Sequence, residues 1–267
     1  MKEAEPMRAI CLHDKSRLAA FLRRNPALYL YLIGDLDEFF WPYTQWYGLE
    51  EGGELREVAL LYAGTSLPVL LALSEDPPAM SELLRGVLHL LPSRMYSHLS
   101  PGVLGALEGR YTAEPHGEHL RMTLADTART LAVDTSRAVR LGTDDLEEVL
   151  EFYRAAYPDG WFDPRMLETG QYFGVRQGGE LASVAGIHVY SPEYGVTAIG
   201  NVATLPTRRG HGLATVATGA LCRALLEHTP SVGLNVSATN AAAVACYRKL
   251  GFVTEASYSE YMLNDER

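Results

Sequence analysis

Hydrophobic and polar residues follow two different periods in the second half of the chain. Three segments, at residues 172–176, 181–190 and 196–205, have the length and composition of strands. Gly178 and Gly179 separate the first two by a tight turn. From Leu213 onwards, apolar residues recur at intervals of three and four, which predicts a helix with one buried face. The pattern therefore predicts an antiparallel meander that leads into a helix.

Shorter elements surround this meander, and residues that favour helix ends or turns bound them. Before the meander we expect a strand at residues 138–141 and two helices, which begin at Thr143 and after Asp163. After the long helix we expect a buried strand at residues 232–236 and a further helix that begins at Asn240.

The first half of the chain also mixes helical and strand-like patterns. Residues 29–47 are dense in aromatic side chains, which pack a core more often than they line a ligand pocket. The expected elements are helices at residues 16–23, 77–91 and 101–108 and strands at residues 55–63, 67–73, 94–98 and 118–124. This half therefore predicts a small mixed α/β unit.

A boundary between the two halves is expected where small and polar residues gather. Residues 126–137 have that composition and are interpreted as a linker. We therefore expect an N-terminal mixed α/β domain at residues 1–125 and a C-terminal domain at residues 138–267. The fold class is α/β, of the α+β kind, and 267 residues are enough for two compact cores.

Composition and charge argue against several classes of function. Lysine and arginine number 23 against 33 acidic residues, for a formal net charge of -10, so nucleic acid is not expected as a partner. Cys11, Cys222 and Cys246 lack the spacing of a zinc or redox motif, so we expect no metal and a cytoplasmic location. The most apolar stretch, residues 58–73, is interrupted by glycine, proline and polar residues, so no membrane span is expected.

A glycine-rich loop opens the helix that follows the meander. It runs through Arg209, Gly210, His211 and Gly212 to Thr215. Glycine lets backbone N–H groups approach an anion, and the helix directs its positive end to the same place. The loop therefore predicts a pyrophosphate site. The alternatives are a tight turn alone and a dinucleotide-binding loop, which would need glycine in place of Thr215 and a parallel βαβ unit.

The helix after the buried strand brings Asn240 and Tyr247 to nearly the same face, because the segment between them makes about two turns. Small alanines between them would let another group approach this face. Asn240 has an alternative interpretation as a helix cap, and Tyr247 has one as a core aromatic residue. His211 and Cys246 are interpreted as a loop residue and a small buried residue, without catalytic roles.

These motifs together resemble the GNAT superfamily of N-acetyltransferases over roughly residues 139–265. Residues 201–206 are similar to the cofactor-facing strand of that family. More narrowly, the layout resembles the glycine N-acyltransferase-like branch, in which a diverged GNAT-like half precedes the cofactor-binding half. The residues that carry the resemblance are Arg209, Gly212 and Ala214 in an Arg-x-x-Gly-x-Ala loop, and Asn240, Ala243, Tyr247, Gly251 and Phe252 in and after the later helix.

The resemblance implies direct transfer of an acetyl or other short acyl group from acyl-CoA to a primary amine of a small molecule or protein. It places the acyl-CoA between splayed strands at residues 196–205 and 232–236, in a mostly antiparallel sheet flanked by helices. Tyr247 would protonate the departing thiolate. The cofactor-binding residues that the resemblance implies are Val202, Ala203, Thr204, Arg209, Gly210, His211, Gly212, Leu213, Ala214, Thr215, Asn240 and Tyr247.

The general base stays open. An attacking amine must lose a proton, and the candidates are Glu193, His188 and a water held by Asn201. The strand at residues 196–205 carries no acidic residue, although the family often has one on the strands before the loop. A CoA-binding sensor or interaction module without turnover is therefore the alternative function. The acceptor and the oligomeric state are also left open, with a homodimer as one alternative.

Overall fold

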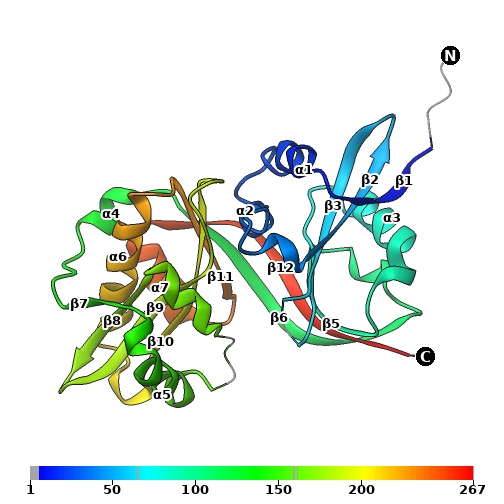
Figure 1. Cartoon of the computed structure of the whole chain (residues 1–267). Coiled ribbons are helices and arrows are strands. Elements are labelled where there is room, and N and C mark those ends of the chain that lie inside the picture. Colours follow the sequence, from blue (N-terminus) through cyan, green and yellow to red (C-terminus); the bar gives the residue numbers. More distant parts are fainter. Residues whose placement is uncertain (1–5, 65, 159, 161, 267) are drawn as a thin grey trace. The chain divides into compact units, whose positions relative to one another are not determined.

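The chain divides into two compact units in this computed structural model, which describes residues 6–64, 66–158, 160 and 162–266 (Figure 1). The first unit consists of Met1–Arg121, Ser237–Thr239 and Glu255–Arg267. The second consists of Met122–Val236 and Asn240–Thr254. Because the last strand of the chain ends in the first unit, that unit draws on both ends of the sequence.

The sheet of the first unit is mostly antiparallel, with one parallel pair between β4 and β5. Residues 259–264 of the last strand pair with β5, and this part of the strand belongs to the first unit. The order is β1 (Arg8–Leu12), β2 (Thr44–Glu51), β3 (Glu54–Tyr62), β4 (Val69–Ala72), β5 (Arg94–Leu99), β12 (Phe252–Asp265) and β6 (Tyr111–Leu124).

Helix α3 (Pro77–Val87) packs against β1, β2 and β3 and closes the main core of the first unit. Asp76 begins this helix by accepting a hydrogen bond from the Ala79 N–H, and Met80 and Leu83 are fully buried. The other helices of this unit are α1 (Lys15–Leu22), α2 (Leu30–Gly34) and the 3₁₀ turns η1 (Trp41–Tyr43), η2 (Leu88–Leu90) and η3 (Leu104–Ala106). The helix expected at residues 101–108 is thus limited to η3, because nearby glycines lower helix propensity.

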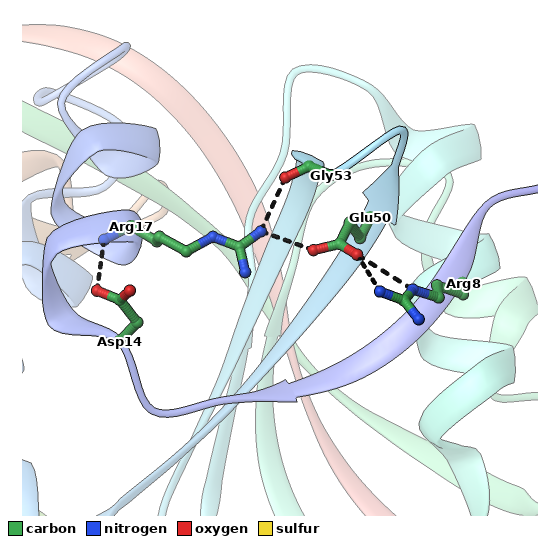
Figure 2. A network of polar contacts seen from close by, with 5 residues as sticks. All are labelled: Arg8, Asp14, Arg17, Glu50 and Gly53. Atoms are coloured by element: carbon green, nitrogen blue, oxygen red, sulfur yellow. Dashed lines mark hydrogen bonds and ion pairs between the residues drawn. The ribbon is translucent and has the colours of Figure 1, made fainter. Parts of the chain in front are cut away.

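Helix α1 is tied to β2 by a carboxylate that two arginines share (Figure 2). Glu50 accepts hydrogen bonds from Arg17 of α1 at 2.7 Å and from Arg8 of β1 at 2.6 Å. The Arg17 and Arg8 bonds hold the pKa of Glu50 below its ordinary value. Asp14 caps the same helix by accepting from the Arg17 N–H at 3.0 Å.

The sheet of the second unit is the predicted meander with one strand added at each side. β7 (Ala138–Leu141), β8 (Tyr172–Gln177), β9 (Glu180–Ser191) and β10 (Val196–Thr204) pair antiparallel in that order. β11 (Ser231–Ser237) then pairs in parallel with β10. The predicted mixed, mostly antiparallel sheet flanked by helices is confirmed.

Helices cover the strands of the second unit. Helix α6 (Leu213–Leu226) packs against β8, β9 and β10, and α5 (Leu146–Ala156) packs against β9 and β10. The remaining helical segments are α4 (Thr127–Leu131), α7 (Ala241–Leu250) and the 3₁₀ turns η4 (Thr143–Asp145), η5 (Pro164–Thr169) and η6 (Pro206–Arg208). This packing fixes the α6 N-terminus directly after β10.

The segment expected to be a linker, residues 126–137, contains α4 and is hydrogen-bonded to the end of α7. The Asp126 N–H donates to the Gly251 carbonyl at 3.1 Å, and the Thr130 hydroxyl donates to the Leu250 carbonyl at 2.7 Å. The division into domains at residues 1–125 and 138–267 stays a prediction.

Candidate functional site

The loop between β10 and α6 has the backbone that the glycine pattern predicts. Gly210 and Gly212 have φ values of +80° and +72°, in the left-handed region that other residues rarely adopt. A side chain built on either glycine would meet nothing within 4 Å, so this side of the loop is open. Gly212 precedes α6 and provides no side-chain cap, and the first N–H groups of a helix have no acceptor within the helix. The loop therefore offers an anion a set of backbone donors at a positive helix end.

Contacts to neighbouring elements hold this loop and helix start in place. The Arg209 side chain, which is exposed, donates from Nε to the Thr204 carbonyl at 3.3 Å. Leu213 is buried, and the Thr215 hydroxyl lies 3.3 Å from Sγ of Cys246 on α7. Burial raises the pKa of the Cys246 thiol, which keeps it protonated at neutral pH. The structure thus brings the α6 N-terminus next to the predicted helix α7.

Strand β10 departs from regular geometry at the residues expected to face the cofactor. Its parallel pairing with β11 covers residues 196–199, and its register with β9 shifts between Gly200 and Ala203. Asn201, in this bulge, has a φ of +54°, the one positive value among the described non-glycine residues. Val202, Ala203 and Thr204 follow the bulge and lead into the glycine loop. Bulges of this kind re-aim backbone groups beside active sites.

Two buried tyrosines hold the bulge. The Tyr153 hydroxyl donates to the Asn201 carbonyl at 2.7 Å, and Nδ2 of Asn201 donates to the Tyr172 hydroxyl at 3.0 Å. The Tyr172 hydroxyl in turn donates to the Ile187 carbonyl at 3.1 Å. Burial raises the pKa of both phenols above the ordinary value, so they remain neutral donors. Sequence reasoning did not find this cluster, because α5 and β8 meet β10 only in the folded chain.

The candidate bases lie at different places along the β9–β10 hairpin. A side chain on Gly200 would come within 1.2 Å of Cδ2 of His188, so the half-buried His188 ring lies over the backbone beside Asn201. Glu193 is exposed in the turn between β9 and β10. The bulge therefore has a histidine beside it, whereas the carboxylate of Glu193 belongs to the opposite end of the hairpin.

Helix α7 has the two ends that the sequence predicts. Asn240 begins it by accepting a hydrogen bond from the Ala243 N–H at 3.1 Å, which confirms the capping interpretation. Tyr247 has 7% of its surface exposed and packs edge-to-face on Phe252, with ring centroids 5.9 Å apart. His211 is exposed in the loop, and Cys246 is half-buried, not fully buried as its interpretation as a small buried residue predicts.

Among the described residues, histidine, cysteine and carboxylate side chains form no cluster of three or more that could hold a metal ion. No helix in the described part of the chain is both long and apolar enough to cross a membrane.

Solved structures share this fold over 78–97% of the chain. A Drosophila protein is 13% identical with a TM-score of 0.69, over 97% of this chain and 98% of that one. A tandem GNAT protein from the clavulanic acid biosynthesis pathway is 15% identical with a TM-score of 0.57, over 96% of this chain and 98% of its own. A GNAT-family protein from Novosphingobium aromaticivorans is 21% identical with a TM-score of 0.56, over 78% and 89%. At these identities the likeness shows the fold.

A bulged strand, a glycine loop and a helix N-terminus follow one another along the chain in an α/β fold. The family model of the acetyltransferase (GNAT) family matches residues 143–252, and all of these elements lie within that range. This part of the chain therefore matches the family that its motifs resemble. Among curated proteins, the search found no match to the sequence. The glycine N-acyltransferase-like branch stays a prediction.

Proposed function

We propose that the second unit transfers an acetyl or other short acyl group from acyl-CoA to a primary amine of a small molecule or a protein. The observation that carries this proposal is the open loop at Gly210 and Gly212, at the N-terminus of α6 and directly after a bulged strand. GNAT-family proteins use acetyl-CoA as the acyl donor, and the family match spans this loop. No metal is part of the proposal.

The donor binds along the loop and the strand before it. Backbone N–H groups from Gly210 to Thr215 hold the pyrophosphate, which they can approach because no side chain covers the glycines. Arg209 adds a positive charge at the exposed rim, and the exposed His211 lies in the same loop. The pantetheine arm follows the backbone of residues 202–204. The buried Leu213 and the adjacent Ala214 fix the helix start, and Asn240 fixes the start of α7.

The reaction is a direct attack in a ternary complex. The amine nitrogen bonds to the thioester carbonyl carbon, the carbon–sulfur bond breaks, and the thiolate leaves as the amide forms. A backbone N–H of the bulged strand stabilises the oxyanion, because fixed dipoles aimed at developing charge lower the barrier. Tyr247 gives its proton to the thiolate and recovers one from solvent. His188 accepts the proton that the amine loses, since it lies beside the bulge at Asn201.

A second candidate function is CoA binding without turnover. The observation in its favour is that β10 (Val196–Thr204) carries no acidic residue that could act as a base. A cytoplasmic location is a further proposal, and the free state of the three cysteines supports it. A homodimer is also proposed. Turnover with an amine separates the two functions.

Calorimetric titration with acetyl-CoA and with NAD, followed by a thiol-release assay over a panel of amines, tests the proposal. We expect saturable heat with acetyl-CoA alone and amine-dependent release of CoA. Gly212→Ala strains the left-handed backbone and covers the N–H groups of the loop. We expect it to weaken acetyl-CoA binding roughly tenfold, because one charge-assisted hydrogen bond to the pyrophosphate, worth about 1.5 kcal/mol, is lost. Gly178→Ala is the control, because its φ of +64° gives similar strain in a turn open to solvent.

Three outcomes decide the matter. Absence of acetyl-CoA binding by folded protein rejects the donor site. Binding without amine-dependent thiol release supports the non-catalytic alternative. Equal loss of affinity in Gly212→Ala and Gly178→Ala would mean that the loop does not contact the pyrophosphate.

A further inference from the structure

The first unit contains a buried arginine whose hydrogen-bond donors are unused. Arg121 lies on β6 and has 1% of its surface exposed. Its Cζ lies 4.8 Å from the centroid of the Tyr31 ring and 5.9 Å from that of Tyr258. Within the described part of the chain, Nε, Nη1 and Nη2 of Arg121 have no hydrogen-bond acceptor. Such a group is rare, because guanidinium donors in a protein interior are almost always paired.

The neighbouring rings stabilise the charge of Arg121 but not its N–H groups. The faces of Tyr31 and Tyr258 attract a cation through the ring quadrupole. Ring faces offer no lone pairs in the plane of the guanidinium, where its five N–H groups point. Burial lowers the pKa of Arg121, yet an arginine in a protein stays charged. The side chain is therefore a cation that still requires an acceptor.

The Glu260 carboxylate contacts four side chains, and Tyr258 of this cluster is one of them. Glu260 accepts from the Tyr96 hydroxyl at 2.5 Å and from the Tyr258 hydroxyl at 3.0 Å. Nε2 of His98 and Nε2 of His119 lie 3.4 Å and 3.5 Å from its oxygens. Burial lowers the pKa of His98 to about 4, so its imidazole is neutral near pH 7. Glu260 thus lies among these four side chains and accepts no hydrogen bond from Arg121.

We propose that the first unit binds a small monocarboxylate through the guanidinium of Arg121. The planar fork of arginine N–H groups matches the two oxygens of a carboxylate. A monocarboxylate brings one negative charge to the guanidinium, whereas a phosphate dianion brings two and is repelled more strongly by Glu260, which is bonded to Tyr258. The site uses residues of the first unit alone and does not depend on the acyl transfer proposed for the second.

Thermal unfolding of the full chain in sodium acetate tests this proposal. Sodium chloride and sodium phosphate at equal ionic strength serve as reference conditions. We expect acetate to raise the Tm saturably and the two reference salts not to do so, because only a ligand of the folded state stabilises by mass action. Arg121→Met keeps an apolar stem of similar length and should abolish the acetate response. Arg56→Met, which removes a half-exposed arginine of β3, should retain it.

A second measurement covers the case in which Arg121→Met fails to fold. The line width of [¹³C]acetate should increase on addition of wild-type protein, and unlabelled acetate should reverse the change. A wild-type protein without any acetate response in either measurement overturns the proposal and leaves Arg121 as a structural cation–π residue. An equal response in folded Arg121→Met places the acetate elsewhere, and a stronger response to phosphate overturns the choice of a monocarboxylate.

Discussion

Gly251 shows how one residue without a side chain joins two segments of the second unit. It ends α7 with a φ of +101°, and its carbonyl accepts hydrogen bonds from the N–H groups of Ala125 and Asp126 at 3.1 Å. A β-carbon at this position would lie 2.1 Å from the Asp126 carbonyl oxygen. The position therefore requires glycine both for its backbone conformation and for the approach of the chain before α4.

We expect Gly251→Ala to lower the free energy of unfolding by roughly 2–5 kcal/mol, from a left-handed backbone penalty of about 1–2 and a packing penalty of about 1–3. Urea unfolding followed by circular dichroism measures the change. Gly178→Ala is the matched control, because it has a φ of +64° and no atom within 4 Å, and it should show the backbone penalty alone. Similar losses in both variants would contradict the close approach at Asp126.

Tyr247 is the residue on which the proposed chemistry depends most directly. Tyr247→Phe keeps the edge-to-face packing on Phe252 but removes the proton donor. We expect acetyl-CoA affinity to be unchanged and CoA release to slow by about 10²–10⁴-fold, the usual contribution of a general acid. Tyr157→Phe, at an exposed tyrosine, should leave both quantities unchanged. Unchanged turnover in Tyr247→Phe would assign the thiolate proton to another donor.

Glu57 makes the stability of the first unit depend on pH. Burial raises its pKa to about 7, although the Ser74 hydroxyl donates to it at 2.6 Å, and Asp76 and Glu75 add to the rise. The folded state holds this proton more tightly than the unfolded state. The protonated Glu57 therefore makes its full contribution to the free energy of unfolding below its ordinary pKa of 4.5. This contribution is lost as the pH rises to about 7.

In the wild type, the free energy of unfolding should fall by an amount on the order of 3 kcal/mol between about pH 4.5 and pH 7 because of Glu57, at roughly 1.4 kcal/mol per pH unit. We expect Glu57→Gln to remove this part of the fall. Urea unfolding across this pH range measures it. Burial raises the pKa of Asp35 to about 8, so part of the slope should persist in Glu57→Gln and disappear when Asp35→Asn is added. An unchanged slope in both variants would mean that neither carboxyl stays protonated in the fold.

At the level of elements, the bulge of β10 depends on its support from α5 and β8. Tyr153→Phe removes the hydroxyl that donates to the Asn201 carbonyl at 2.7 Å, which should cost about 1 kcal/mol in stability. Because the bulge directs the backbone of residues 202–204, we also expect kcat/KM for acetyl-CoA to fall. Tyr111→Phe is the control, since it removes a hydroxyl that donates to the Pro92 carbonyl at the same 2.7 Å distance in the first unit.

Stability and steady-state kinetics of the two variants separate the roles. Similar losses of stability with a kinetic defect confined to Tyr153→Phe support a positioning role. Equal kinetics in both variants would mean that the bulge keeps its geometry without this hydrogen bond.

The sequence predicts an element accurately where the pattern that defines it is local in the chain. The meander β8–β10 and helix α6 lie within a residue or two of their predicted bounds, because regular periodicity and glycine turns fix them. Strands β1, β2 and β12 were not predicted, since residues 29–47 read as an aromatic cluster and much of β12 is only half-buried. The predicted helix at residues 101–108 was wrong beyond η3.

The same distinction applies to the candidate site. The left-handed glycines and the cap at Asn240 belong to local motifs, so the sequence could predict them. The tyrosines that hold Asn201 are distant in sequence, since Tyr153 lies 48 positions and Tyr172 lies 29 positions before it. No local pattern connects these residues. Arg121 and Tyr258 likewise meet only through the pairing of the distant strands β6 and β12. The cofactor contacts themselves stay predictions.

At the scale of the whole molecule, the chain leaves the first unit near Arg121 and returns to it with the second half of β12. In the strand order of the first unit, β12 lies between β5 and β6. Its residues 259–264 pair antiparallel with residues 94–99 of β5, and the buried Leu263 belongs to the core of that unit. A piece that ends at residue 125 would therefore lack an interior strand and expose two long edges.

We accordingly expect residues 1–125 expressed alone to give a collapsed or aggregated chain without dispersed amide resonances. Adding a peptide of residues 252–267 should restore a folded spectrum, because it supplies the β12 partner of β5. A peptide with Leu263→Asp is the matched control and should fail, since it places a charge in the core. Amide spectra of the three samples decide the question. A well-dispersed spectrum from residues 1–125 alone would instead support the domain boundary predicted from the sequence and would make β12 an accessory strand of the first unit.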